Sequence, residues 1–138
     1  MDTQKFDAAI AYYLQMMKEL MKKEKHSFEN SKTVVPEKAG VYAIYDKKGG
    51  AIIYVGRTKH LNTRLLRNHK RGNTKRSQFR RALKRDKSLE SEDDITRYIE
   101  KNCVFQFMEI EDFEEQVRLE HFMTAISAPV LNVKLKQR

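Results

Sequence analysis

Cysteine is nearly absent from this chain, and long apolar runs are missing altogether. Cys103 is the single cysteine among 138 residues, which excludes an internal disulfide and a zinc site built from cysteines. No apolar run approaches the roughly 20 residues that a membrane-spanning helix needs. The first residues also lack the apolar segment of a secretory signal, so we expect a cytoplasmic protein with no membrane partner.

Positive charge, by contrast, is abundant and concentrated. The chain has a net charge of +9, and residues 57–87 contain thirteen Lys or Arg but one acid, Asp86. Such a patch favours a nucleic-acid partner, because neutralised phosphates release condensed counterions. A solvated helix face is the alternative, and charge alone does not distinguish DNA from RNA. The candidate contacts are Arg57, Lys59, Arg67, Lys70, Arg71, Lys75, Arg76, Arg80, Arg81 and Lys84.

Two short segments have the composition of β-strands joined by a turn. They are residues 40–42, Gly-Val-Tyr, and residues 54–56, Tyr-Val-Gly, and residues 46–50 between them are typical of a turn. If the loop of this hairpin has three residues, Tyr42 lies directly opposite Tyr54. Both phenols then project from one face of the sheet. Two paired tyrosines beside a basic segment are a candidate site for phosphate chemistry.

The two triplets resemble the signature of the GIY-YIG nuclease family, with valine in the middle of each. The resemblance continues in order through Arg64, His69, Glu120 and Asn132, and covers about residues 38–133. It implies a metal-dependent endonuclease that hydrolyses DNA, duplex or branched, with Mg²⁺ as cofactor and Mn²⁺ as a substitute. Cleavage in this family leaves 3′-hydroxyl and 5′-phosphate ends.

The remaining patterns predict an α+β fold with a small three-stranded antiparallel sheet flanked by helices. Alternation over residues 103–110 predicts the third strand, and helices are expected over about residues 61–71, 77–87 and 91–100. We expect the nuclease-like domain to span residues 36–138. The preceding residues 1–35 form an extension with an amphipathic helix from about Lys5 to Glu24 and a polar connector after it. That helix either packs on the domain's own sheet or mediates a homodimer or protein contact.

Glu120 stands out without reference to any family. Asp112 and Glu115 predict the start of a helix that ends at about Ser127. Its apolar face is defined by Phe113, Val117, Leu119, Met123 and Ile126. Glu120 falls within this face, where a carboxylate must be paired, protonated or bound to metal. A structural salt bridge with an arginine is one interpretation; the resemblance implies a divalent metal ligand.

The resemblance also implies roles for the other candidate catalytic residues. Tyr42 and Tyr54 would surround the attacking water, and we favour Tyr54 as general base with Tyr42 orienting or sharing the proton. The positive charge of Arg57, Arg64, the metal and His69 would lower the phenol pKa from its usual value near 10. Arg64 would hold the scissile phosphate, and Arg57 would help bind it.

His69 and Asn132 have structural interpretations beside the functional ones. His69 shares a helical stripe with Leu61 and Leu65, which is equally typical of a hydrogen-bonded core histidine. Asn132 follows Pro129 and is typical of a turn or a helix cap. The resemblance implies that both belong to the active site.

Two other functions remain open on the sequence alone. One is a catalytically inactive DNA-binding module that keeps the fold. The other is a nuclease subunit that a partner protein targets through the N-terminal helix.

Overall fold

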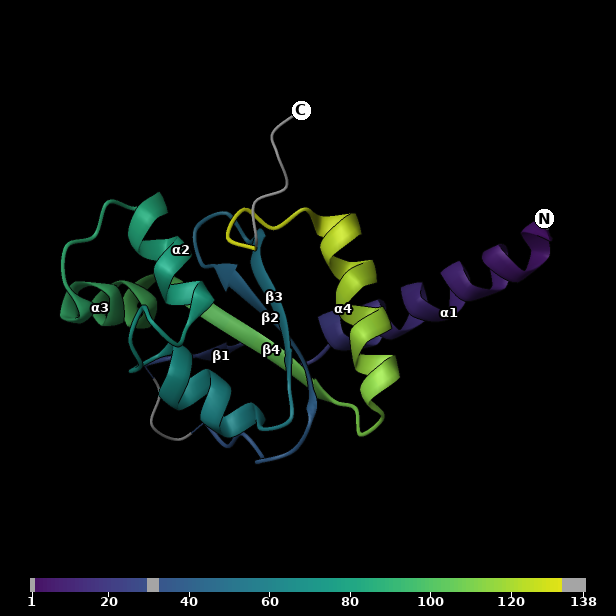
Figure 1. Cartoon of the computed structure of the whole chain (residues 1–138), viewed down its shortest axis with the longest axis horizontal. Helices are drawn as coiled ribbons and strands as arrows, with labels where there is room; N and C mark the ends of the chain where they lie inside the picture. The colour runs from purple at the N-terminus through teal and green to yellow at the C-terminus, as the bar shows by residue number, and fades with distance from the viewer. Residues whose placement is uncertain (1, 30–32, 133–138) are drawn as a thin grey trace.

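The computed structural model describes residues 2–29 and 33–132, and its centre is one antiparallel sheet (Figure 1). Within these residues the sheet has four strands in the order β1-β4-β2-β3. Their bounds are His26–Ser27 for β1, Gly40–Asp46 for β2, Ile52–Thr58 for β3 and Cys103–Glu109 for β4. The predicted α+β class is confirmed.

The predicted number of strands is wrong, because β1 lies in the segment expected to be a polar connector. His26 pairs with Phe105 and Ser27 with Val104 at the outer edge of β4. Phe28, which follows, is fully buried, and its ring centroid lies 4.6 Å from that of Phe105. Burial of this single aromatic ring therefore holds the short strand against the sheet.

Helices cover both faces of the sheet. Helices α1 (Thr3–Met21) and α4 (Phe113–Ser127) lie on one side, and α2 (Gln78–Asp86) and α3 (Glu92–Asn102) on the other (Figure 1). The helix η1 (Thr63–His69) contributes Leu65 to the same core as Phe79 of α2 and Ile95 of α3. Each core takes alternate residues of the strands, as a sheet buried on both faces requires.

The helix starts follow the capping residues that the sequence predicts. Ser91 and Asp94 form a reciprocal capping box at the start of α3, and the Asp112 side chain accepts from the amide of Glu115 at the start of α4. Ser77 caps α2 by accepting from the amide of Arg80. The predicted helices over 77–87, 91–100 and 112–127 therefore form.

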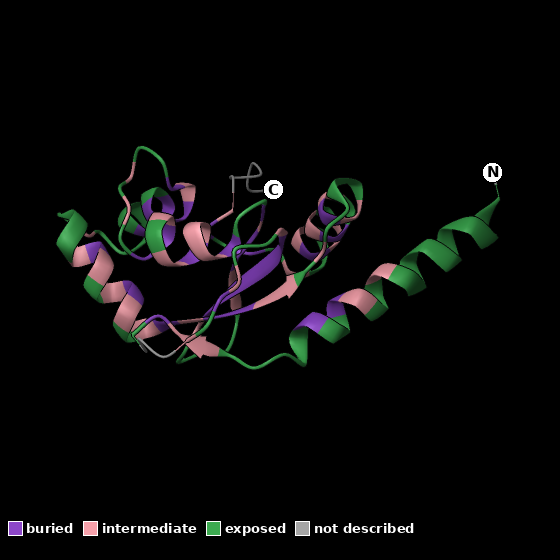
Figure 2. Ribbon diagram, turned by 90° about the horizontal axis from the view of Figure 1, so that it is seen from below, coloured by how far each residue is buried: buried purple, intermediate pink, exposed green. Residues whose placement is uncertain are grey.

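Only the C-terminal half of α1 packs on the sheet. Met17 and Leu20 are buried against Val41 and Leu119, whereas Phe6 and Ile10 are about half exposed. The N-terminal half projects beyond the rest of the molecule (Figure 2). The expected packing of this helix thus holds for one half, and contact of the other half with a partner stays a prediction. Along the described residues, no helix combines the length and apolar character needed to cross a membrane.

The hairpin register differs from the predicted one. Tyr42 pairs with Gly56, and Tyr54 pairs with Ile44, because a bulge follows Ile44 and the turn extends to Ala51. Tyr42 and Tyr54 still share a face of the sheet. Tyr54 lies opposite Ile44, which is two residues after Tyr42 on the same strand. Their ring centroids lie 6.4 Å apart in a stacked arrangement.

Candidate active site

A cavity of about 440 Å³ opens at β3, the edge strand of the sheet. Six of the residues singled out in the sequence line it: Tyr42, Tyr54, Arg57, Arg64, Glu120 and Asn132. They come from β2, β3, η1, α4 and the segment after α4. The fold therefore brings together side chains that are spread between positions 42 and 132 of the sequence.

Gly56 allows the two strands of the hairpin to form this cavity. A Cβ atom at Gly56 would overlap the Tyr42 phenol oxygen, so the ring can lie across the strand only where there is no side chain. Gly56 also lines the cavity itself. A glycine is therefore required at position 56, because the Tyr42 ring lies too close for any side chain there.

Burial dominates the electrostatics of the two phenols. Desolvation raises the pKa of Tyr54 to about 12, although the nearby Arg64 guanidinium lowers it. Desolvation, together with Tyr54, raises the pKa of Tyr42 well above its usual value. Without a metal ion the loss of hydration therefore outweighs the charge of Arg64, and the expected lowering of the phenol pKa with a metal bound stays a prediction.

His69 lies behind Tyr42 and does not line the cavity. The His69 Nε2 atom is 2.6 Å from Tyr42 Oη, and its Nδ1 atom is 2.7 Å from Ser77 Oγ. The residue is 1% exposed, and burial, with further contributions from Arg64 and Arg80, lowers its pKa to about 3. The histidine is thus the hydrogen-bonded core residue of the structural interpretation, and its hydrogen-bond partner is the Tyr42 phenol.

The helix that positions Arg64 and His69 is a π-helix rather than the predicted α-helix. The amide of Lys70 donates to the carbonyl of Leu65 five residues earlier, at 3.2 Å. Leu61, Leu65 and His69 are all buried, as their predicted stripe requires. Single π-helical turns are uncommon and occur mostly at functional sites.

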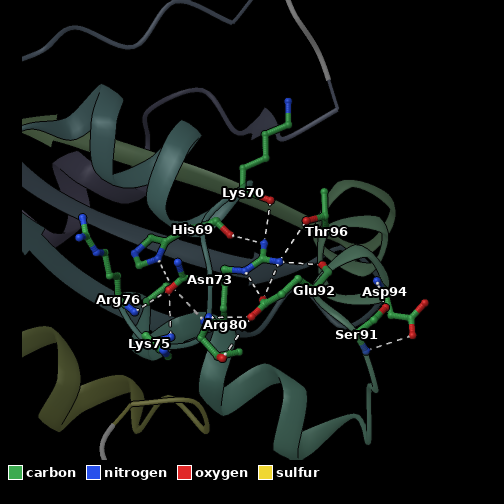
Figure 3. Close-up of polar contacts among 12 residues, drawn as sticks. His69, Lys70, Asn73, Lys75, Arg76, Arg80, Ser91, Glu92, Asp94 and Thr96 are labelled. Carbon is green, nitrogen blue, oxygen red and sulfur yellow. Dashed lines mark hydrogen bonds and ion pairs between the residues drawn. The ribbon is translucent and has the colours of Figure 1, made fainter.

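Arg80 anchors the end of this helix from within the core. Its guanidinium donates to the carbonyls of His69 at 3.0 Å, Lys70 at 2.8 Å and Glu92 at 2.8 Å. It also bonds the Thr96 hydroxyl, and Figure 3 shows these contacts radiating from one side chain. Arg80 thereby satisfies carbonyl groups that a helix end leaves unpaired.

Two predicted nucleic-acid contacts are consequently wrong. Arg80 is 0% exposed and Lys70 is 8% exposed, so neither belongs to the basic surface. Arg57 is half-buried. The other predicted contacts are exposed: Lys59, Arg67, Arg71, Lys75, Arg76, Arg81 and Lys84.

Glu120 is paired with an arginine, as its structural interpretation predicts. Arg57 Nη1 donates to Glu120 Oε1 at 2.9 Å, and the Glu120 side chain is 16% exposed. The predicted apolar face of α4 is partly wrong. Phe113 and Ile126 are 54% and 60% exposed, because the sheet contacts Leu119 and Met123 while the Phe113 ring lies against Arg57.

The donor set around Glu120 fits a magnesium ion that keeps most of its water ligands. Glu120 supplies one carboxylate at the cavity wall, and among the described residues no hydrogen bond ends on its Oε2 atom. The same residues contain no cluster of three or more His, Cys, Asp or Glu that would form a metal cage. Mg²⁺ is commonly bound by one or two carboxylates together with water and substrate phosphate.

Asn132 fastens the chain after α4 to the edge strand. Its side-chain oxygen accepts from the Val55 amide at 2.9 Å, and its side-chain nitrogen donates to the Val55 carbonyl at 2.8 Å. Leu131 adds a backbone bond to Ile53 at 3.0 Å. Asn132 and Leu131 together therefore hold β3 on either side of Tyr54.

Some residues of the site were not found from the sequence. His121 lines the cavity, with its Nε2 atom 3.9 Å from Glu120 Oε1. Thr124 also lines it, one helical turn after Glu120. Helical spacing from Glu120 could have identified Thr124, whereas nothing in the sequence distinguishes His121 or Ser77.

The sequence profile of the GIY-YIG catalytic domain matches residues 38–123. The chain therefore belongs to the GIY-YIG family. The match contains both triplets, Arg64, His69 and Glu120, and it ends before Asn132.

Solved structures of GIY-YIG domains share this fold. The chain is similar to the GIY-YIG N-terminal endonuclease domain of UvrC from Thermotoga maritima bound to its catalytic divalent cation, magnesium. The TM-score is 0.50 and the identity 24%, over 72% of this chain and 89% of that one. A Tyr-to-Phe mutant of that domain gives a TM-score of 0.49 at 24% identity, over 73% and 89%. No curated protein matches the sequence.

Proposed function

We propose that this protein is a magnesium-dependent endonuclease that hydrolyses DNA phosphodiester bonds. The observation that carries the proposal is a cavity at the sheet edge that is lined by Tyr42, Tyr54, Arg64 and Glu120 together. Membership of the GIY-YIG family supports the same reaction.

The two phenols hold the attacking water between them. The Tyr42 hydroxyl donates to the water oxygen, and Tyr54 in its phenolate form accepts the water's proton as that oxygen attacks phosphorus. The bond from phosphorus to the 3′ oxygen then breaks, and the leaving oxygen takes a proton from solvent. Arg64 favours the phenolate and donates to the phosphate oxygens, where negative charge develops.

Glu120 is the residue that would hold the metal, with Mn²⁺ as an alternative to Mg²⁺. A divalent ion bound there supplies positive charge that stabilises the transferring phosphate and favours an ionised phenol. Arg57 pairs with Glu120 in the structure, so it must share or leave the carboxylate when the ion binds.

The exposed basic residues of η1, α2 and their connection form the DNA-binding surface. Arg67, Arg71, Lys75 and Arg76 are exposed there, and Arg64 on η1 reaches the cavity. Phosphate contacts of this kind position the duplex without reading its sequence. Duplex and branched DNA are both suitable substrates for such a surface.

Cleavage of supercoiled plasmid tests the proposal. Nicked and linear DNA should form with MgCl₂ or MnCl₂ and not with EDTA, and Glu120→Gln should abolish cleavage while it leaves DNA affinity within about twofold. Glu114→Gln is the matched control, because Glu114 lies on the same helix with a side chain that is 74% exposed. It should cleave like the wild type.

Two results would contradict the proposal. Tight binding without cleavage in either metal, on plasmid and on branched DNA, would indicate an inactive binding module. Metal-dependent cleavage that persists in Glu120→Gln would show that the active site lies elsewhere.

A further inference from the structure

We propose that Ser77 is a positioning residue that sets the tautomer of His69 and, through it, the direction of the Tyr42 hydroxyl. Neither Ser77 nor His69 lines the cavity, so both act through Tyr42. The effect of Ser77 on the His69 tautomer follows from the hydrogen bonds alone. Its effect on DNA cleavage rests on the proposed function.

Ser77 has two hydrogen-bond partners within the described part of the chain. Its Oγ atom accepts from the amide of Arg80 at 3.1 Å, which is the cap of α2, and it lies 2.7 Å from His69 Nδ1. The residue is 0% exposed, so its hydroxyl hydrogen cannot reach water. His69 Nδ1 is therefore the acceptor for that hydrogen.

A neutral histidine has one ring hydrogen, and Ser77 decides which nitrogen carries it. Because His69 is buried with a pKa of about 3, its ring is neutral at pH 7. Acceptance from Ser77 at Nδ1 places the hydrogen on Nε2. That N–H then donates to Tyr42 Oη, 2.6 Å away.

The opposite tautomer would leave a buried donor without a partner. If His69 Nδ1 donated to Ser77, the serine hydroxyl hydrogen would have no acceptor, which is unfavourable for a buried donor. In the favoured arrangement the Tyr42 hydroxyl hydrogen is the one without a protein acceptor. Tyr42 is 1% exposed overall but lines the cavity, so water or a phosphate oxygen bound in the cavity is the acceptor available to that hydrogen.

The direction of these bonds matters to the reaction. Tyr42 presents a donor to the attacking water and leaves Tyr54 as the acceptor of its proton. With the opposite tautomer of His69, the Tyr42 hydroxyl would donate to His69. The water would then be held by Tyr54 alone. Ser77 thus determines whether the two tyrosines have different roles.

The first test is the tautomer of His69 in the free, metal-free protein. Long-range ¹H–¹⁵N correlation of the imidazole rings distinguishes the Nε2–H form from the Nδ1–H form, and the His69→Gln variant assigns the signals. We expect the Nε2–H pattern in the wild type. An Nδ1–H pattern would overturn the proposal, whether or not the protein cleaves DNA.

The second test removes the hydroxyl with little change to the helix cap. Glycine is nearly as good an N-cap as serine, so Ser77→Gly should fold. We expect it to lose the pure Nε2–H pattern and to cleave about tenfold more slowly at saturating substrate, with DNA affinity unchanged. Ser77→Thr, which restores a hydroxyl, should recover both the pattern and the rate.

The chain offers a matched control in Ser91, which caps α3 with an exposed side chain. Ser91→Gly should change neither the His69 signals nor the cleavage rate. If Ser77→Gly retains the Nε2–H pattern, or loses it while cleaving at the wild-type rate, Ser77 does not have the proposed role. Absence of cleavage in the wild type would contradict the proposed function and leave the NMR test decisive for the tautomer.

Discussion

Arg57 of β3 donates to Glu120 of α4 at 2.9 Å, so the carboxylate that would bind metal is paired with a cation of the edge strand. The two residues are 63 positions apart in the sequence and meet because α4 packs beside β3. Arg57 neutralises the carboxylate in the structure and would compete with a metal ion for it.

We therefore expect Arg57→Met to bind Mn²⁺ more tightly and to cleave more slowly. Removal of the guanidinium relieves competition for Glu120, and it also removes a donor from the cavity that would contact phosphate. Isothermal titration with Mn²⁺ should show about a tenfold lower Kd, on the scale of one lost charge interaction. Equal or weaker Mn²⁺ binding in Arg57→Met would show that the pair does not compete with metal.

The burial of His69 makes the fold sensitive to acid. Its pKa is about 3 in the folded protein and 6.5 ordinarily, so the unfolded state binds more protons between these values. Stability due to this residue is full above pH 6.5 and decreases as the pH falls toward 3, by roughly 1 kcal/mol per pH unit. Urea unfolding of the wild type and His69→Gln at several pH values isolates this contribution.

The two unfolding curves should converge as the pH falls, because Gln has no proton to gain. His60→Gln, at an exposed position, should keep the pH dependence of the wild type. A constant difference between wild type and His69→Gln from pH 7 to pH 4 would mean that His69 is protonated in the folded state.

Local signals in the sequence were sufficient for most of the elements. The Asp46 to Gly50 turn forms as predicted, with the Lys48 amide donating to Asp46 Oδ1 and Gly50 at a positive φ of 68°. The capping residues Ser91 and Asp112 begin their helices. These signals are reliable because each depends on hydrogen bonds within four residues.

The errors concern features that long-range contacts decide. Strand β1 has two residues and depends on the burial of Phe28, which no local pattern reveals. In the sequence, Arg80 belongs to a run of basic residues, which predicts that it lies on the basic surface. The pattern of charges does not reveal that the carbonyls of His69 and Lys70 at the end of η1 accept hydrogen bonds from it. The pKa values of Tyr42 and Tyr54 likewise depend on burial that only the folded chain defines.

Asn132 should contribute to both stability and catalysis. Asn132→Ala removes both bonds to Val55 and leaves the edge of β3 unpaired beside Tyr54. We expect a loss of about 1–3 kcal/mol in the free energy of unfolding. The cleavage rate should also decrease, with DNA affinity largely retained.

Asn132→Asp separates the two bonds of that side chain. A carboxylate can still accept from the Val55 amide but cannot donate to the Val55 carbonyl, so its stability should lie between wild type and Asn132→Ala. Urea unfolding measures the order of the three proteins. Equal stability of all three would show that Asn132 does not anchor the strand.

Arg80 and Arg76 provide the sharpest contrast between a structural and a DNA-binding arginine. Arg80→Met leaves the carbonyls of His69, Lys70 and Glu92 without their donor, so we expect a loss of roughly 3 kcal/mol or more in stability. Arg76 is exposed, and Arg76→Met should keep the wild-type stability. It should weaken DNA binding and reduce the slope of log Kd against log salt by about 0.9, the value for one phosphate contact. Unfolding curves and salt-dependent binding measure both effects. If Arg80→Met kept the wild-type stability and bound DNA more weakly, Arg80 would be a DNA contact and not a structural residue.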